Sequence, residues 1–428
     1  MARTFRSGRS CPATTTDLAV VVPPSRGWLG VYLGVVQFFF TATWIVYVIY
    51  LPQLVAQAGL PKGAAAWMLM ADQLVFVFAD YAAGVAADRV GRVVGRIGLW
   101  VLAATVVSAL SFLALPFLAS QGSPAVFVAV VMVWAVTSSA LRAPPLGLLG
   151  KHVAKPSRPL LSGLSMLGLG VANGFAPYLG LQLRGVDPRI PFVLSSLALA
   201  LVTCGLVAAE RRLARRRDAA ADESTTVAIA SDAETGGIVA KKPSKTVFFA
   251  MALLAALAFQ VHVFIDSAPL DRAHAPATLL PMLTPVFGIG FNIGMLPLSL
   301  AVGRWPAARA MAAAAFVAAI AAALATVAPT LPWLIAAQLV TGAAWAGLVV
   351  AAFAWALARS GAGSAGAFAG TLSAVLALAT LARMASVAAG WPQSPAFGEA
   401  LAWWPVAGWL GASVGVVVLI ARRPTQPA

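Results

Sequence analysis

The segment Gly84-Val-Ala-Ala-Asp-Arg-Val-Gly-Arg-Val-Val-Gly-Arg96 lies at the junction of two apolar runs, 63–86 and 97–119. Each run is long enough to cross a bilayer, because a helix needs about 20 apolar residues to do so. The segment is short, yet it carries four charged residues: Asp88, Arg89, Arg92 and Arg96. A charged connection this short between two such runs indicates a loop at a membrane surface.

The composition excludes a soluble globular protein. Of the 428 residues, 61% are hydrophobic and 10% are charged, and the mean hydropathy is +0.88. A soluble domain has close to half apolar and a quarter charged residues. The net charge of +15 is divided among short segments between apolar runs, so it indicates membrane topology rather than a nucleic-acid partner. The two cysteines, Cys11 and Cys204, fit neither a disulfide framework nor a thiolate metal site.

Twelve apolar runs have the length of a membrane-spanning helix. They predict an all-α polytopic membrane protein with about 12 transmembrane helices, and eleven is the alternative because the Ala-rich stretch 310–357 can be divided differently. The expected spans are 28–54, 63–86, 97–119, 125–149, 159–183, 189–209, 247–268, 278–302, 309–329, 331–357, 365–389 and 401–421.

The Lys and Arg residues indicate the orientation of these spans. With a cytoplasmic N-terminus, 23 of the 29 basic residues fall in cytoplasmic segments, and four fall outside: Lys62, Arg184, Arg189 and Arg272. We therefore expect a multi-pass plasma (inner) membrane protein with both termini in the cytoplasm. The apolar stretch Leu18 to Val22 is too short for a signal-peptide core, so we expect the first span to be an uncleaved anchor.

The longest polar stretch between apolar runs divides the spans into two groups of six. It begins with a basic cluster, continues with acidic and small residues, and ends with further lysines, so we expect a largely disordered cytoplasmic linker. The expected organisation is an N-terminal tail 1–27, a six-helix bundle 28–209, the linker 210–246, a second six-helix bundle 247–421 and a C-terminal tail 422–428.

The pattern in residues 84–96 resembles the loop motif of the major facilitator superfamily (MFS) of secondary transporters. That motif has a Gly, three residues, Asp-Arg, one residue, Gly-Arg, and a further basic residue after three more. The matching positions are Gly84, Asp88, Arg89, Gly91, Arg92 and Arg96. The resemblance implies the MFS fold of two six-helix bundles, transport by alternating access and a gating role for these residues. It extends over the whole chain at the level of twelve spans and their equal division.

Physical chemistry also favours a gate at this motif. Gly84 would allow close approach of a neighbouring helix backbone. Asp88 could accept backbone N–H groups at a helix N-terminus or pair with Arg92. The alternative is plain anchoring by basic residues, which requires arginines but neither the Asp nor the glycines. In the second half only Gly303-Arg304 and Arg309 remain of an equivalent motif.

Two apparent signatures elsewhere are weaker. The spacing Gly361-x-Gly363-x-x-Gly366 matches a dinucleotide-binding loop, but no strand precedes it, so we expect helix packing or a cytoplasmic turn. A drug–proton antiporter signature in the fifth span is matched only in part, with Ala172 and Ala176 in place of glycines.

Charged residues inside spans need a partner or a function, because an ionised group in the bilayer core costs about 2.5–3.5 kcal/mol. Depth along the helices suggests two pairs: Asp72 with Arg383 in the outer third, and Asp80 with Arg142 in the inner third. The alternatives are snorkelling for the arginines and hydrogen bonding to a neighbouring helix for the aspartates.

In the seventh span, His262 and Asp266 are four residues apart and would share a helix face, which suits proton coupling. Alternatively, Asp266 is a hydrated residue at the membrane edge.

The resemblance implies that spans one, four, seven and ten line a central cavity. Residues of spans five and eight could reach the rim of this cavity. The expected lining is aromatic and amide-rich, which suits a small organic solute better than a phosphate. The candidate cavity residues are Gln37, Thr41, Trp44, Tyr47, Trp134, Thr137, Asn173, Gln260, Asn292, Gln338, Thr341 and Trp345.

We therefore expect a proton-coupled secondary transporter that exports a drug-like compound or takes up a nutrient or cofactor precursor, and that works as a monomer in the lipid bilayer. The rival is an MFS-like membrane protein that acts as a sensor or scaffold without transport. The sequence contains no phosphate-binding loop, no catalytic nucleophile with a base and no His and carboxylate cluster, so we expect no enzyme activity, no cofactor and no metal.

Overall fold

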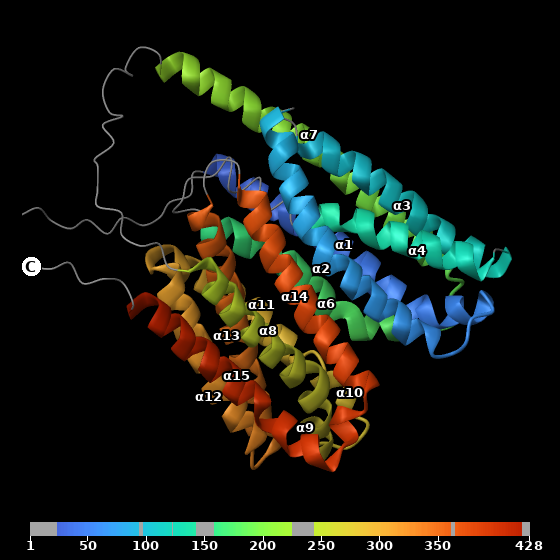
Figure 1. Ribbon diagram of the computed structural model, residues 1–428, viewed down its shortest axis with the longest axis vertical. Helices are drawn as coiled ribbons and strands as arrows, with labels where there is room; N and C mark the ends of the chain where they lie inside the picture. The colour runs from blue at the N-terminus through green and yellow to red at the C-terminus, as the bar shows by residue number, and fades with distance from the viewer. Residues whose placement is uncertain are drawn as a thin grey trace, which may run out of the picture.

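The protein is an array of long helices that run roughly parallel and antiparallel to one another (Figure 1). The computed structural model describes residues 24–93, 97–121, 123–142, 158–224, 244–360 and 364–421, and it contains no β-strand among them. Ten of the described helices are long and apolar enough to cross a membrane, and two shorter apolar helices, Pro124–Ser138 and Arg189–Gly205, complete twelve crossing segments. This is the all-α architecture that the sequence predicts.

The first half contains six of these segments. They are α1 (Pro24–Gln57), α2 (Ala64–Val93), α3 (Ile97–Gln121), α4 (Pro124–Ser138) with the 3₁₀ turn η1 (Ser139–Leu141), α6 (Arg158–Gln182) and α7 (Arg189–Ser224).

The second half contains the other six, and two of them are interrupted. The seventh segment passes through α8 (Lys245–Val261), the π-helical turn η3 (His262–Asp266) and α9 (Ser267–His274). The eighth begins with a single turn, α10 (Leu280–Leu283). The rest are α11 (Val286–Arg304), α12 (Ala307–Thr326), α13 (Leu331–Arg359), α14 (Ala365–Ala388), the short η4 (Trp391–Gln393) and α15 (Pro395–Ala421).

Two expected boundaries are wrong. The fourth span was expected to reach residue 149, but its α-helix ends at Ser138, and residues 143–149 lie outside the described residues. The linker was expected to begin at residue 210, but α7 continues to Ser224. Residues 210–224 contain neither Gly nor Pro and are rich in Ala and Arg, which are good helix formers. The remainder of the expected linker, 225–243, lies outside the described residues, as do the tails 1–23 and 422–428.

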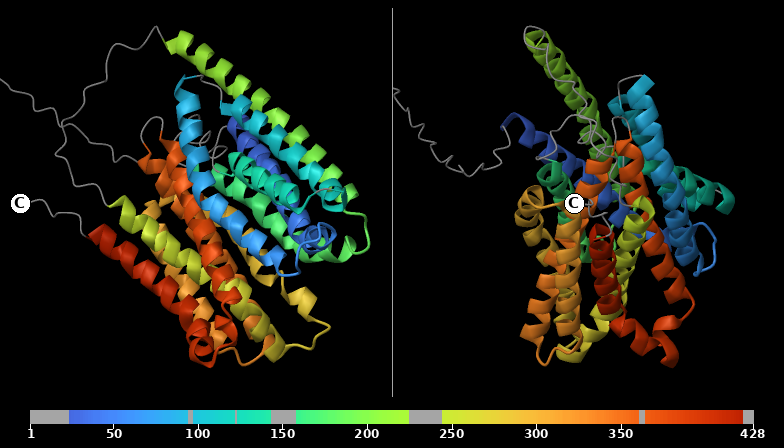
Figure 2. Two further views of the ribbon diagram at one scale, coloured as in Figure 1. Left: turned by 45° about the vertical axis from the view of Figure 1, so that its right-hand side comes forward. Right: turned by 60° about the vertical axis from the view of Figure 1, so that its left-hand side comes forward.

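Two helix pairs make most of the contact between the halves: α2 packs beside α14, and α6 packs beside α11 (Figures 1 and 2); α6 also contacts α13. We call the side where α1 begins and α15 ends the termini side, and the opposite side the far side. In Figure 1 the helices of the two halves diverge toward the far side. The glycine contacts of the α2–α14 pair lie nearer the termini side, and the Gly170–Asn292 contact of the α6–α11 pair lies near the middle of α6.

Glycines make both joints close. A Cβ atom on Gly84 of α2 would collide with the carbonyl oxygen of Gly366 on α14, and one on Gly370 would meet the Asp80 carbonyl oxygen at 2.5 Å. On the other joint, a Cβ on Gly170 of α6 would lie 2.5 Å from the Asn292 side-chain oxygen. The backbones of α2 and α14 therefore meet without intervening side chains, as is common for helix pairs in membranes, whereas side chains of α11 pack directly against the backbone of α6 at Gly170.

Candidate transport site and gate

The candidate gate on the termini side is a carboxylate from one half that caps a helix of the other half. Asp88, near the end of α2, accepts the backbone N–H groups of Gly366 at 2.8 Å and Ala367 at 2.7 Å. Both groups belong to the first turn of α14, where N–H groups have no partner within the helix. A negative charge there is stabilised by the hydrogen bonds and by the helix dipole. The contact therefore holds α2 against α14 through hydrogen bonds to the α14 backbone.

The other motif residues are distributed along the end of α2. Gly84 forms the close contact with Gly366, and Arg89 is exposed. Gly91 and Arg92 lie in the last turn of α2, but the Arg92 side chain lies outside the described part of the chain, as does the whole of Arg96. The Gly-rich segment that resembles a dinucleotide-binding loop ends at Gly366, whose N–H contacts Asp88.

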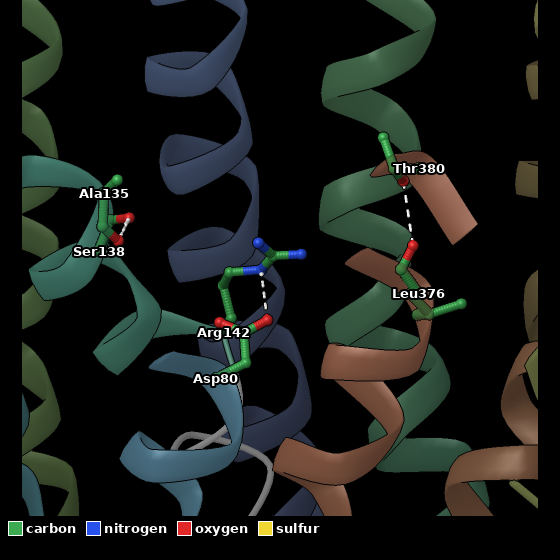
Figure 3. A network of polar contacts seen from close by, with 6 residues as sticks. All are labelled: Asp80, Ala135, Ser138, Arg142, Leu376 and Thr380. Carbon is green, nitrogen blue, oxygen red and sulfur yellow. Dashed lines mark hydrogen bonds and ion pairs between the residues drawn. The ribbon is translucent and has the colours of Figure 1, made fainter. Parts of the chain in front are cut away.

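An ion pair lies about two helix turns from Asp88 along α2, toward the far side (Figure 3). Asp80 is fully buried in α2, and its Oδ2 lies 3.3 Å from the Nε of Arg142, which follows η1 at the end of α4. The Arg142 guanidinium also lies over the Phe76 ring, 4.4 Å from its centre. The arginine thus has a carboxylate and an aromatic face as partners, and the pairing suggested by helix depth is present in the structure.

Asp72 lies two helix turns nearer the far side and has a different environment. It is fully buried, and the Tyr47 hydroxyl donates to its Oδ2 at 2.7 Å. Tyr47 packs at 4.5 Å against Trp134, which stacks on Trp44 at 5.7 Å. Within the described residues Asp72 and Arg383 form no ion pair, because each contacts a neighbour in its own half.

Arg383 belongs to a polar chain between α14 and α8. Its Nε donates to the side-chain oxygen of Gln260 at 3.2 Å, and the Gln260 amide donates to the Thr380 hydroxyl at 2.9 Å. Figure 3 shows Thr380, whose hydroxyl donates in turn to the Leu376 carbonyl. The Arg383 guanidinium lies 4.7 Å from the centre of the Phe264 ring. The sequence interpretation did not single out Thr380 or Phe264.

The π-helical turn separates the two titratable residues of the seventh segment. His262 is buried and its Nε2 lies 2.9 Å from the side-chain oxygen of Gln338 on α13. Asp266 ends the turn, and its Oδ2 has no hydrogen-bond partner among the described residues. Because a π-helical turn joins residues i and i+5, positions four apart no longer stand directly above one another. Such turns are frequent at functional sites.

The remaining predicted cavity residues are placed as follows. Gln37, Thr41, Gln338, Thr341 and Trp345 are buried, Asn173 is exposed, and Thr137 donates to the Val133 carbonyl. Trp345 stacks on Phe259 with ring centres 4.4 Å apart. Asn292 lies in the α6–α11 joint, and its Oδ1 has no hydrogen-bond partner among the described residues.

A cavity that the sequence did not predict opens on the far side of the first half. Its volume is about 600 Å³, and its lining includes Gln53, Arg184 and Arg189. The Tyr50 hydroxyl shapes it by donating to the carbonyls of Leu183 at 3.0 Å and Val186 at 3.2 Å. No cluster of three or more potential metal ligands occurs in the part of the chain that the structure describes.

The sequence profile of the Major Facilitator Superfamily matches residues 33–382. The chain belongs to this family of transporters. None of the curated protein sequences that were compared with the chain matches it.

Solved structures of three transporters share the fold. The human organic anion transporter MFSD10 (TETRAN) is 14% identical, with a TM-score of 0.64 over 94% of this chain and 99% of its own. A bacterial homologue of the iron transporter ferroportin, in an outward-facing state, is 13% identical, with a TM-score of 0.69 over 92% and 100%. The proton:xylose symporter XylE is 14% identical, with a TM-score of 0.61 over 91% and 94%. Identities this low establish the fold alone.

Proposed function

We propose that the protein is a proton-coupled secondary transporter that moves a small organic solute across the plasma (inner) membrane by alternating access. In this proposal it works as a monomer with both termini in the cytoplasm, and the termini side is the cytoplasmic side. Solute binds between the halves near the middle of the membrane, as in other transporters built from repeated bundles. We favour export over uptake because the fifth span retains part of an antiporter signature.

The observation that carries the proposal is that α2 combines a gate with two buried carboxylates. Asp88 caps α14 at the termini side, while Asp72 and Asp80 are fully buried further along the same helix. Both carboxylates lie away from bulk water on the helix that packs against α14. Protonation of either group would change the electrostatic balance of the helix that forms the joint between the halves. This arrangement supports coupling between a proton and the gate.

The test uses purified protein in liposomes that contain a pH-sensitive dye. Addition of a transported solute from a panel of organic compounds should move protons together with the solute, and an imposed proton gradient should drive accumulation. Neutralising the coupling group by Asp72→Asn, Asp80→Asn or Asp266→Asn should abolish accumulation but spare solute exchange. Transport without any proton movement would show that another ion or no ion is coupled, and the absence of any transport would favour the sensor or scaffold.

A further inference from the structure

Arg383 carries a charge inside a membrane-spanning helix and has no acidic partner in the part of the chain that the structure describes. It is half-buried near the far-side end of α14. Charged side chains in the bilayer are rare and mark pathways for solutes or ions. Within the described residues, no carboxylate lies within salt-bridge distance of its guanidinium. The positive charge is therefore available to a negative group from outside the protein.

Two buried acids on helices that pack against α14 or lie next to Phe264 have other environments. Asp72 of the facing helix α2 accepts the Tyr47 hydroxyl. Asp266, at the end of the π-helical turn, forms no ion pair with Arg383. Neither carboxylate neutralises the arginine in this conformation, in which the halves diverge on the far side (Figure 1).

Hydrogen bonds hold the Arg383 guanidinium in a fixed orientation. Gln260 accepts from Nε through its oxygen, and its amide group is fixed in turn by donation to Thr380. This chain occupies Nε and leaves the two terminal nitrogens, which form no hydrogen bond within the described residues. The N–H groups of these nitrogens form a planar fork that matches the two oxygens of a carboxylate.

Aromatic rings extend from the guanidinium toward the centre of the second half. Phe264, beneath Arg383, is 54% exposed and contacts Phe259 edge to face at 6.1 Å between ring centres. Phe259 stacks on Trp345 at an angle of 2°. The charge therefore lies at one end of a row of contacting aromatic rings, and the exposed member of that row, Phe264, suits a ligand with a ring next to its charged group.

We propose that the transported solute is an organic anion, whose carboxylate binds the Arg383 fork and whose aromatic or apolar body packs along Phe264 and Phe259. This inference rests on the proposed function and names the substrate class of that site. The Arg383 fork provides the charge and direction of binding, and the rings provide apolar area.

The experiment compares matched ligands on the full-length protein in lipid nanodiscs. Benzoate, phenylacetate and 2-naphthoate are each paired with their neutral amides, and affinity is measured by calorimetry and by thermal stabilisation. At least one carboxylate should bind about tenfold or more tightly than its amide, because a charged hydrogen bond contributes that much to affinity.

Three variants locate the effect. Arg383→Gln should weaken carboxylate binding about tenfold to a hundredfold and leave amide binding unchanged, and Arg383→Lys should give an intermediate loss because it keeps the charge but not the fork. Gln260→Glu should also weaken it, because it places a carboxylate beside Nε. Arg184→Gln, at an exposed arginine of the far-side cavity, is the matched control and should change nothing.

Equal binding of carboxylates and amides, or unchanged carboxylate binding in Arg383→Gln, would overturn the inference and show that Arg383 only snorkels to the membrane surface. Transport assays on the same samples separate this result from the proposed function. Transport that does not depend on the charge of the solute would refute the anion site but support the proposed transport function. Arg383-dependent binding without transport would support the anion site but refute the transport function.

Discussion

Asp88→Asn should open the gate on the termini side. The asparagine keeps one acceptor oxygen but turns an amide donor toward the second N–H group, so one of the two hydrogen bonds to Gly366 and Ala367 is lost. A hydrogen bond to a charged group contributes about 1.5–3 kcal/mol, and the charge at the helix N-terminus contributes about 0.3–1 kcal/mol. The loss of about 2–4 kcal/mol would shift the equilibrium between the closed and open gate by about thirtyfold to several-hundredfold.

Cysteine labelling measures this shift directly. In a background with Cys11→Ser and Cys204→Ser, a Ser373→Cys reporter lies on α14 at a position that is 6% exposed, one turn from Gly370 in the joint. Its reaction with a maleimide should accelerate in proportion to the open population if opening is fast relative to labelling. We expect an increase of about thirtyfold or more at unchanged protein abundance, with strongly reduced transport.

A matched substitution controls for the loss of charge. Asp187→Asn removes a carboxylate that accepts the Arg189 N–H in the far-side loop, and it should leave both labelling and transport unchanged. If Asp88→Asn labels and transports at the rate of its parent, the hydrogen bonds to α14 do not hold the gate, and the reasoning fails.

Three further predictions concern the helices around this gate. Gly84→Ala should separate α2 from α14, because the added Cβ would collide with a backbone oxygen, so the melting temperature and the transport rate should fall. Gly63→Ala is the control: its Cβ would meet no atom within 4 Å, and the variant should match the parent protein. Arg142→Gln leaves a buried carboxylate without its partner and should destabilise the protein by about 3–5 kcal/mol in chemical unfolding, and a loss below about 1 kcal/mol would mean that the pair is hydrated. Asp72→Asn and Arg383→Gln should each impair transport, and the double variant should recover part of the loss if the two charges pair when the far side closes; simple additivity in a double-mutant cycle would exclude that pairing.

Much of the architecture could be predicted from sequence because membrane helices depend on local features. Apolar runs of about 20 residues predicted the number of spans, and the motif of Gly84 and Asp88 predicted the family. The helical continuation of α7 to Ser224 was missed because polar composition suggested a linker. The Ala- and Arg-rich composition of residues 210–224 favours a helix, and this local preference outweighs the polar character of the segment.

The contacts of the site depend on rotation and on distant neighbours, and neither can be counted along the chain. Depth along the helices is enough to suggest the contact of Asp80 with Arg142. It does not account for the Gln260 partner of Arg383, which depends on how α8 and α14 face each other. The π-helical turn at His262 also has no marker in the sequence, and it changes which faces its residues occupy.

The Asp88 contact is made to the peptide groups of α14 and not to any of its side chains. Recognition by a backbone places few demands on the sequence of the recognised helix. Gly366 must remain small because a Cβ there would lie 2.9 Å from Oδ1 of Asp88, whereas Ala367 contributes only its N–H group. The information that specifies the contact is therefore stored almost entirely in the first half of the chain. A motif search will find the carboxylate in α2 and pass over the helix that receives it.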